Sequence, residues 1–485
     1  MPAPGQAETL FFAQLPVTLA LVFLYALPVP GLVSLPEGAS LALVTMLVSL
    51  PIWYWAAQAR MSPFDATATR AIVVVLSCAG FLTFWSLLSI VGAEAPMRAS
   101  RYLATLVAAF ALYFMVRGTV TRPHIARYVD ALALGLAATA AVSLLAYEVG
   151  GLHEIIFRGT DRAAGFFKNP NQFGMAISTA IPAVLALMLS EQRRRPLRVV
   201  YLILMLLGLV ASGSKTNFLL AWASILVVVS CYSWIYNTGS RRVGMMVMSV
   251  AGNLVFAGLG IFALTLLNPR ALAIMMEFFG GDGEVDSLLT RSYLWTYSLD
   301  QFLIDPVFGQ GAGQRLDIFY READVSHSHN VLLDYMRTLG APGLFAVSVM
   351  IGTVVIVCLQ TTGRALHSGR GAPADRMICL GLSLSCLSYV AANMSSDSFG
   401  PSTSPFFWIF AYLSFAARSL MRPLPAAGTR PRQQPHVPSF GRFPDLMPQA
   451  AFDTAGRSSS LSGRLWMALW LILIGAALIL ALSVM

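Results

Sequence analysis

Long apolar stretches, separated by short polar breaks, run along almost the whole chain. About 20 consecutive apolar residues are needed for a helix to cross a bilayer. Segments of that kind predict thirteen spans, at 10–30, 39–58, 71–93, 101–117, 125–149, 172–190, 197–212, 216–236, 243–267, 340–360, 376–396, 403–420 and 465–484. The pattern therefore predicts an all-α polytopic membrane protein with about 12 core transmembrane helices, plus one extra C-terminal span.

Composition supports a membrane protein. The chain is 57% hydrophobic and 11% charged, whereas soluble domains carry roughly 25% charged residues. The net charge of +9 does not indicate nucleic acid, because the basic residues stand in short runs between apolar segments. Such runs are orientation signals and contacts to membrane lipids.

The basic runs fall in alternate loops, which predicts the orientation. Arginines gather near 60–70, 117–127, 193–198, 241–242, 364–376 and 422–442. Under the positive-inside rule these loops and the N-terminus are cytoplasmic, and the first span is retained. The segments 31–38, 94–100, 150–171, 213–215, 268–339 and 397–402 then face the periplasm of a bacterial inner membrane.

Three regions follow from this map. Residues 1–420 form a polytopic membrane domain, in which 268–339 is a large helical periplasmic loop before the tenth span. Residues 421–463 are rich in Pro, Ser, Gly and Arg, and predict a disordered cytoplasmic linker. Residues 464–485 form the additional helix. The five cysteines lie in apolar segments without metal-ligand spacing, so we expect no disulfide and no zinc site.

The strongest candidate for chemistry is the segment Ser326-His327-Ser328-His329-Asn330. Imidazole transfers protons near neutral pH, and the chain has only six histidines. Ser326 or Ser328 is predicted to cap a helix that begins at about His329. His329 would then stand in its first turn near the membrane surface, with His327 as its rival.

The same loop carries cations beside an amphipathic pattern. Ser287–Phe302 predicts a helix that lies on an apolar surface through Leu288, Trp295, Leu299 and Phe302. Arg291 stands one turn before Trp295, and Arg is the natural bidentate partner of phosphate. Arg315 lies further along. Gly309-Gln-Gly311-Ala-Gly313 is interpreted as flexible turns, since no strand precedes it.

Two other predicted outer segments are polar. The first runs from Arg158 through Arg162 to Asn171, which could cap the sixth predicted helix. The second is the short turn around Lys215, where a cation is a functional candidate, with snorkelling to lipid headgroups as the alternative. Basic groups on one side of the membrane suit an anionic lipid-linked ligand such as a pyrophosphate. No Asp-x-Asp pattern accompanies them, which suggests a metal-independent reaction.

Several of these segments resemble one family. His329-Asn330, nine residues, Gly340, two residues and Gly343 match the His-[Asn/Ser/Gln]-x9-Gly-x2-[Gly/Thr/Tyr] pattern of the O-antigen ligase and O-antigen polymerase superfamily. Other similar segments are Thr290–Trp295, Asp305–Gly311, Arg162–Asn171 and Ser212–Lys215. Lys215 stands where the ligase pattern usually has Arg, and Thr290 replaces a Gly.

The resemblance implies glycan transfer from undecaprenyl pyrophosphate to a sugar hydroxyl in the periplasm, without a cofactor. It gives His329 the role of general base and Arg291 that of catalytic cation. It implies that the pyrophosphate is bound by Arg291, Arg162, Lys215 and Arg158. Candidate supporting residues of the site are Asn330, Asn171, His327 and Arg315. Expected partners are the lipid-linked donor, a glycan or lipid A-core acceptor, and a chain-length regulator or flippase.

Three alternative functions remain. Polymerisation of O-antigen or exopolysaccharide repeat units is favoured slightly by Lys215-Thr216. Ligation to lipid A-core is the alternative. A lipid-linked glycan transporter would place charged residues at the midplane of its spans, whereas here they gather at one face.

Overall fold

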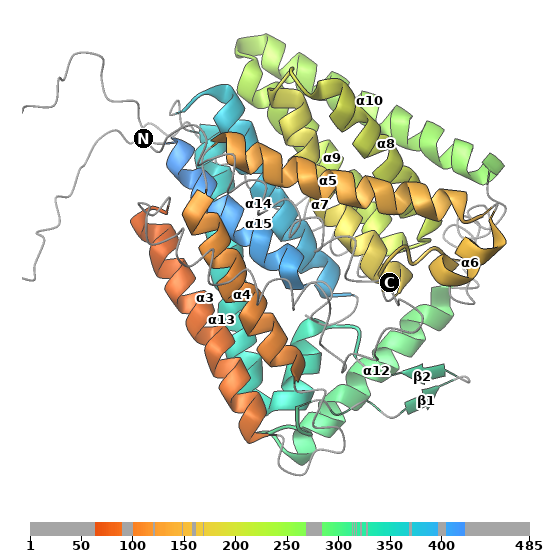
Figure 1. Cartoon of the computed structure of the whole chain (residues 1–485), viewed down its shortest axis with the longest axis vertical. Helices are drawn as coiled ribbons and strands as arrows, with labels where there is room; N and C mark the ends of the chain where they lie inside the picture. The colour runs from red at the N-terminus through yellow and green to blue at the C-terminus, as the bar shows by residue number, and fades with distance from the viewer. Residues whose placement is uncertain are drawn as a thin grey trace, which may run out of the picture.

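The computed structural model describes residues 64–89, 100–119, 122–147, 149–157, 162–167, 169–267, 284–312, 314, 316, 318–320, 323–325, 328–367, 371–395 and 404–421. Within these ranges the protein is a bundle of long helices, with one helix running obliquely beneath it (Figure 1). The predicted spans 10–30, 39–58 and 465–484 and the predicted linker 421–463 lie outside the described residues.

The other predicted spans all coincide with helices. In chain order the helices are α3 (Ala66–Leu88), α4 (Ser100–Thr119), α5 (Arg122–Leu145), α7 (Pro170–Ser190), α8 (Arg195–Ala211), α9 (Lys215–Tyr236), α10 (Gly239–Leu267), α13 (Val331–His367), α14 (Pro373–Asn393) and α15 (Ser404–Ala417). Among the described residues, six helices are long and apolar enough to cross a membrane: α3, α5 from Pro123, α7, α9, α13 and α14. The protein is thus a helical, multi-pass membrane protein.

The centre of the bundle is formed by α7, α14 and α15. Every residue of α15 is buried, and α14 packs along α7. The close approach depends on small residues, because a Cβ on Gly381 of α14 would overlap Ala186 of α7. Helices that associate inside a membrane favour such small residues, since backbone proximity increases van der Waals contact.

The two ends of the bundle differ in composition. At the histidine end, α13 begins after His329 and α3 ends. At the basic end, α3 begins and α13 ends, and the arginine-rich turns 193–198 and 241–242 lie there. Contacts between distant segments support this grouping, since Trp234 near the end of α9 donates to the carbonyl of Leu366 near the end of α13.

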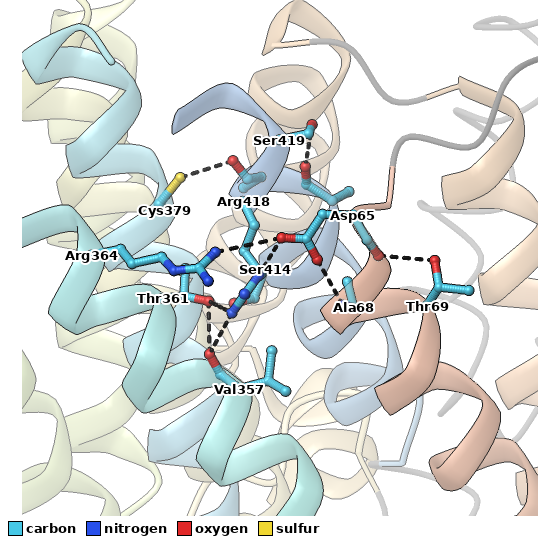
Figure 2. Close-up of polar contacts among 12 residues, drawn as sticks. Asp65, Ala68, Thr69, Val357, Thr361, Arg364, Cys379, Ser414, Arg418 and Ser419 are labelled. Atoms are coloured by element: carbon cyan, nitrogen blue, oxygen red, sulfur yellow. Dashed lines mark hydrogen bonds and ion pairs between the residues drawn. The ribbon is translucent and has the colours of Figure 1, made fainter. Parts of the chain in front are cut away.

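Buried ion pairs stabilise the basic end. Asp65 caps α3 through the backbone N–H of Ala68 at 2.7 Å, and its other oxygen accepts from Arg418 Nε at 3.2 Å. Figure 2 shows Arg364 and Arg418 both directed at this same oxygen, with Arg364 Nη1 at 3.5 Å. Arg418 also donates to Thr361 Oγ1 at 3.2 Å, so one guanidinium joins the ends of α3, α13 and α15.

A second pair lies at the same end. Arg198 of α8 is fully buried and donates from Nε to Asp130 of α5 at 2.7 Å, and from Nη2 to Glu191 at 3.1 Å. An unpaired buried charge is costly, whereas a paired and hydrogen-bonded one is tolerated. These arginines therefore belong to the framework of the bundle.

The described part of the predicted outer loop contains one long helix and departs from an all-α fold at one place. It contains α12 (Glu284–Ile304) and a short antiparallel hairpin of β1 (Ile318–Tyr320) and β2 (Ala323–Val325), in which Phe319 pairs with Asp324. A short helix, α6 (Gly150–Phe157), and a 3-10 turn, η2 (Arg418–Met421), complete the described elements.

Candidate functional site

His329 lies just outside a helix, in a backbone conformation that few side chains adopt. Its φ is 52°, and among the described residues it is the one non-glycine residue with a positive φ. Histidine is enriched several-fold in this region, although the conformation still costs free energy. Such an outlier persists where the surrounding contacts hold it in place, and it is a recognised mark of a functional position.

The helix after His329 begins later than the sequence predicts. It starts at Val331, and the side chain of Asn330 accepts hydrogen bonds from the N–H groups of Leu332 at 2.9 Å and Leu333 at 3.2 Å. Asn330 is therefore the cap, and the prediction of Ser326 or Ser328 was wrong. Asn is among the best capping residues because its short side chain reaches these N–H groups. His329 precedes the first turn instead of lying within it.

Both neighbours of His329 are anchored. The buried Ser328 accepts through its carbonyl from Trp295 Nε1 of α12 at 3.1 Å. On the other side, Asn330 Nδ2 donates to the carbonyl of Met394, which follows α14, at 3.1 Å. The imidazole is thus carried on a three-residue segment fixed to two separate helices.

Arg291 lies on the face of α12 that packs against the protein. It stands one turn before Trp295, and its side chain is half-buried. Burial lowers the pKa of the Arg291 guanidinium, because removal from water disfavours the charged form. An anion bound near it would offset that cost.

The predicted packed face of α12 needs one correction. Leu294 and Ser298 are buried, whereas Leu299 is exposed, although the sequence assigned it to the packed face. The spacing of apolar residues identified a helix but not its orientation, because this helix has an apolar residue on its outward face as well.

Arg162 and the turn before Lys215 form the second half of the site. Arg162 donates from Nε to the carbonyl of Ser212 at 2.9 Å and from Nη2 to Asn171 Oδ1 at 2.6 Å. The guanidinium crosses Gly213, where an added Cβ would stand 3.2 Å from Nε. Lys215 is the first residue of α9. Burial lowers the pKa of Arg162, which again favours an anionic ligand.

A buried amide supports this half of the site and was missed by the sequence analysis. Asn217 is 1% exposed; it donates to the carbonyl of Asn171 at 3.1 Å and to Ser214 Oγ at 2.8 Å. The cap of α7 is Asn169, whose side chain accepts from the N–H of Gln172 at 2.9 Å. The prediction that Asn171 caps this helix was therefore wrong. Asn171 instead binds Arg162.

A short series of contacts joins the two halves. Asn330 binds the carbonyl of Met394, and the adjacent Asn393 donates to Met175 Sδ at 3.1 Å. Met175 stands one turn after Asn171 on α7. Helices α7, α9 and α13 all begin at this end of the bundle, so the positive ends of their dipoles lie here. The arrangement suits an anion beside a base.

The glycines of the His329 motif have clear structural roles. Gly340 has φ 67° and interrupts α13. A Cβ there would overlap the carbonyl of Val307, while the N–H of Ala341 donates to the carbonyl of Pro306 at 2.8 Å. A Cβ on Gly343 would overlap Leu339. The first glycine therefore allows the turn after α12 to dock against α13.

A buried pair near His329 was also missed. Asp334 and Arg337, in the first turns of α13, form an ion pair at 3.2 Å with both side chains almost fully buried. Arg337 also donates to the carbonyl of Gln314 at 3.1 Å. The i, i+3 spacing of opposite charges on a helix was the available signal. The pair connects the start of α13 to the segment that follows α12.

Three predicted site residues, Arg158, His327 and Arg315, lie outside the described residues. Among those described, no group of three or more His, Cys, Asp or Glu side chains is arranged to hold a metal ion. The five cysteines are free.

Comparison with known protein families finds a match to part of the chain. Residues 200–348 match the family model described as O-Antigen ligase. This stretch includes Lys215, Arg291, His329 and both motif glycines, while Arg162 and Asn171 lie before it. No curated protein matches the chain. The match confirms the resemblance drawn from the sequence motifs.

Proposed function

We propose that this chain, which carries an O-antigen ligase domain over residues 200–348, transfers a glycan from undecaprenyl pyrophosphate to a sugar hydroxyl. The domain supports glycan transfer of the O-antigen ligase or polymerase kind. The observation that carries the finer proposal is the joining of His329, through Asn330, Asn393 and Met175, to the segment where Asn171 binds Arg162.

His329 is the general base in this proposal. Its ring takes the proton of the acceptor hydroxyl while the acceptor oxygen bonds to the anomeric carbon of the donor sugar. The bond from that carbon to the pyrophosphate oxygen breaks, and the pyrophosphate leaves with its electron pair. A positioned base contributes typically 10²–10⁴-fold to such a step, and the strained, doubly anchored backbone keeps the imidazole in one place.

The cations bind the leaving group. Arg162, Lys215 and Arg291 hold the pyrophosphate and stabilise the charge that develops on it. Arg162 is already oriented by Ser212 and Asn171, so little side-chain entropy is lost on binding. The pyrophosphate supplies the driving force, so the proposed reaction needs no metal and no nucleotide.

The proposed site faces the periplasm. The support is the separation of charge along the bundle, because the arginine-rich turns lie at the end opposite to His329. With those turns in the cytoplasm, as the positive-inside rule requires, the N-terminus is cytoplasmic and the protein lies in the inner membrane of a bacterium.

Two acceptors are candidates, a second lipid-linked repeat unit and lipid A-core. The pair Lys215-Thr216 favours a second lipid-linked repeat unit, which makes the protein a polymerase. The description of the matched family favours lipid A-core as acceptor, which makes it a ligase.

The test is transfer from a purified lipid-linked donor by the full-length chain in detergent or nanodiscs. His329→Asn is the informative variant, because Asn tolerates a positive φ but has no titratable ring. We expect a loss of at least about 100-fold in the transfer rate. His367→Asn is the matched control, since His367 lies at the basic end, exposed and beside the carbonyl of Gly363.

Undiminished transfer by His329→Asn would refute the role of His329 as general base. Running the same assay with a second lipid-linked repeat or with lipid A-core identifies the acceptor. Transfer that disappears on addition of EDTA and returns with a divalent cation would contradict metal independence.

A further inference from the structure

The outward face of α12 changes from polar to apolar along the helix. Ser292 and Thr296 are exposed near its middle. Two turns later the exposed residues are Leu303 at 68% and Ile304 at 70%. Thr296 and Leu303 are seven residues apart and so lie on the same face. The change in polarity therefore follows the length of the helix and not its circumference.

The apolar surface continues beyond the end of the helix. Val307 and Phe308 of the following turn are exposed, and the Phe308 ring stacks on Trp85 of α3 with centroids 5.2 Å apart. Trp85 stacks in turn on Phe81, at 5.9 Å. Figure 1 shows the later end of α12 beside the end of α3, below the bundle.

The apolar surface on α12 adjoins helix α3. It is one of the helices able to cross a membrane, and its outward residues Phe84, Leu87 and Leu88 are exposed. Exposed apolar side chains on a membrane-crossing helix are compatible with acyl chains, which are as apolar as they are. The patch on α12 meets that surface at the stacked rings of Trp85 and Phe308. Soluble surfaces rarely expose apolar patches of this kind without a partner.

We propose that the last turn of α12 from Leu303 and the turn to Phe308 lie in the boundary between headgroups and acyl chains of the bilayer, while Thr296 lies in water. The occupant of the patch is membrane lipid. Aromatic side chains concentrate at this depth in membrane proteins. Exposed Asp300, between Thr296 and Leu303, marks the water boundary.

This placement determines the height of the candidate base above the membrane. Trp295, between the two halves of α12, holds the carbonyl of Ser328, and His329 follows directly. The depth of α12 therefore positions the histidine at the level of a headgroup. The inference concerns the membrane position alone and does not depend on the proposed reaction.

The experiment measures depth on the full-length chain in nanodiscs. Leu303→Cys and Thr296→Cys are labelled separately with the fluorophore NBD, and Ile304→Cys repeats the measurement at the neighbouring position. The parent chain, treated in parallel, gives the background, because Cys78 is half-buried and the other cysteines are buried. Quenching is recorded with lipids that carry a nitroxide near the headgroup, and separately with aqueous iodide.

We expect the label at Leu303 to be quenched several-fold more by the lipid nitroxide than by iodide, and the label at Thr296 to show the reverse. Equal access of iodide to both labels would overturn the proposal. A label at Leu303 shielded from both quenchers would also overturn it, since protein, such as a second copy of the chain, would then cover the patch. If the lipid nitroxide quenched both labels, Thr296 would also lie in the membrane, which would contradict the proposal.

Discussion

Replacement of Gly340 by Ala tests the link between the motif glycine and the histidine. In the native protein Gly340 interrupts α13 at φ 67° and lets the turn after α12 reach the helix. Two backbone hydrogen bonds cross this junction, from Gln310 N to the carbonyl of Arg337 and from Ala341 N to that of Pro306, both at 2.8 Å. An alanine Cβ would overlap the carbonyl of Val307.

The expected cost follows from these contacts. The positive φ costs an L-residue about 1–2 kcal/mol. Displacing the turn to relieve the overlap breaks the two hydrogen bonds, each worth about 1 kcal/mol net. The sum is about 3–4 kcal/mol of stability at the junction. Because the turn is continuous with α12, its displacement also moves Trp295 and the segment that carries His329.

The assay combines thermal unfolding of the purified protein with glycan transfer. Gly340→Ala should lower the unfolding temperature and reduce transfer at least about tenfold, the equivalent of 1.4 kcal/mol of lost positioning. Gly352→Ala is the matched control, since it lies in the same helix and a Cβ there meets nothing within 4 Å. It should stabilise the helix by up to about 1 kcal/mol.

The reasoning would be refuted if Gly340→Ala kept both the unfolding temperature and the transfer rate of the parent. It would also be refuted if Gly352→Ala and Gly340→Ala behaved alike. Gly309→Ala gives an independent check from the other side of the junction, because its Cβ would stand 2.6 Å from the backbone nitrogen of Gly340.

Three further outcomes are expected. Arg418→Ala should destabilise the protein by about 3 kcal/mol and the half-exposed Arg364→Ala by less than about 1 kcal/mol, in thermal unfolding. Burial raises the pKa of Asp65, but its hydrogen bond from Ala68 and the charge of Arg418 outweigh burial and hold it below the ordinary 3.8; Asp65→Asn should therefore cost stability at neutral pH, and the deficit should shrink only as the pH falls below about 4. Arg162→Lys keeps the charge but loses the forked geometry, so the Michaelis constant for the donor lipid should rise about tenfold, a change of about 1.4 kcal/mol.

Much of the architecture followed from the sequence. The predicted spans within the described residues all coincide with helices, because partition between water and lipid acts on each apolar stretch separately. The motif at His329 and its two glycines also predicted a resemblance to the family whose model matches residues 200–348. The spacing alone could not say why a glycine stands at 340; the structure gives a positive φ and a close backbone contact.

The errors concern single positions. Asn169 caps α7 where Asn171 was predicted, and Asn330 caps α13 where a serine was predicted. In each case two capping residues lie within a few positions of one another, and local propensity does not separate them. The choice depends on what else the second residue binds, and Asn171 binds Arg162.

What the sequence determined by itself, within the residues that the structure describes, is where the long apolar helices lie along the chain. What only the tertiary structure decided is which polar groups meet. Asp65 and Arg418 are 353 positions apart, and Ser328 and Trp295 are 33 apart. The apolar pattern is a local property that each segment carries alone. Pairing of charges and amides depends on how helices pack, and that packing is fixed by many small contacts spread over the whole chain.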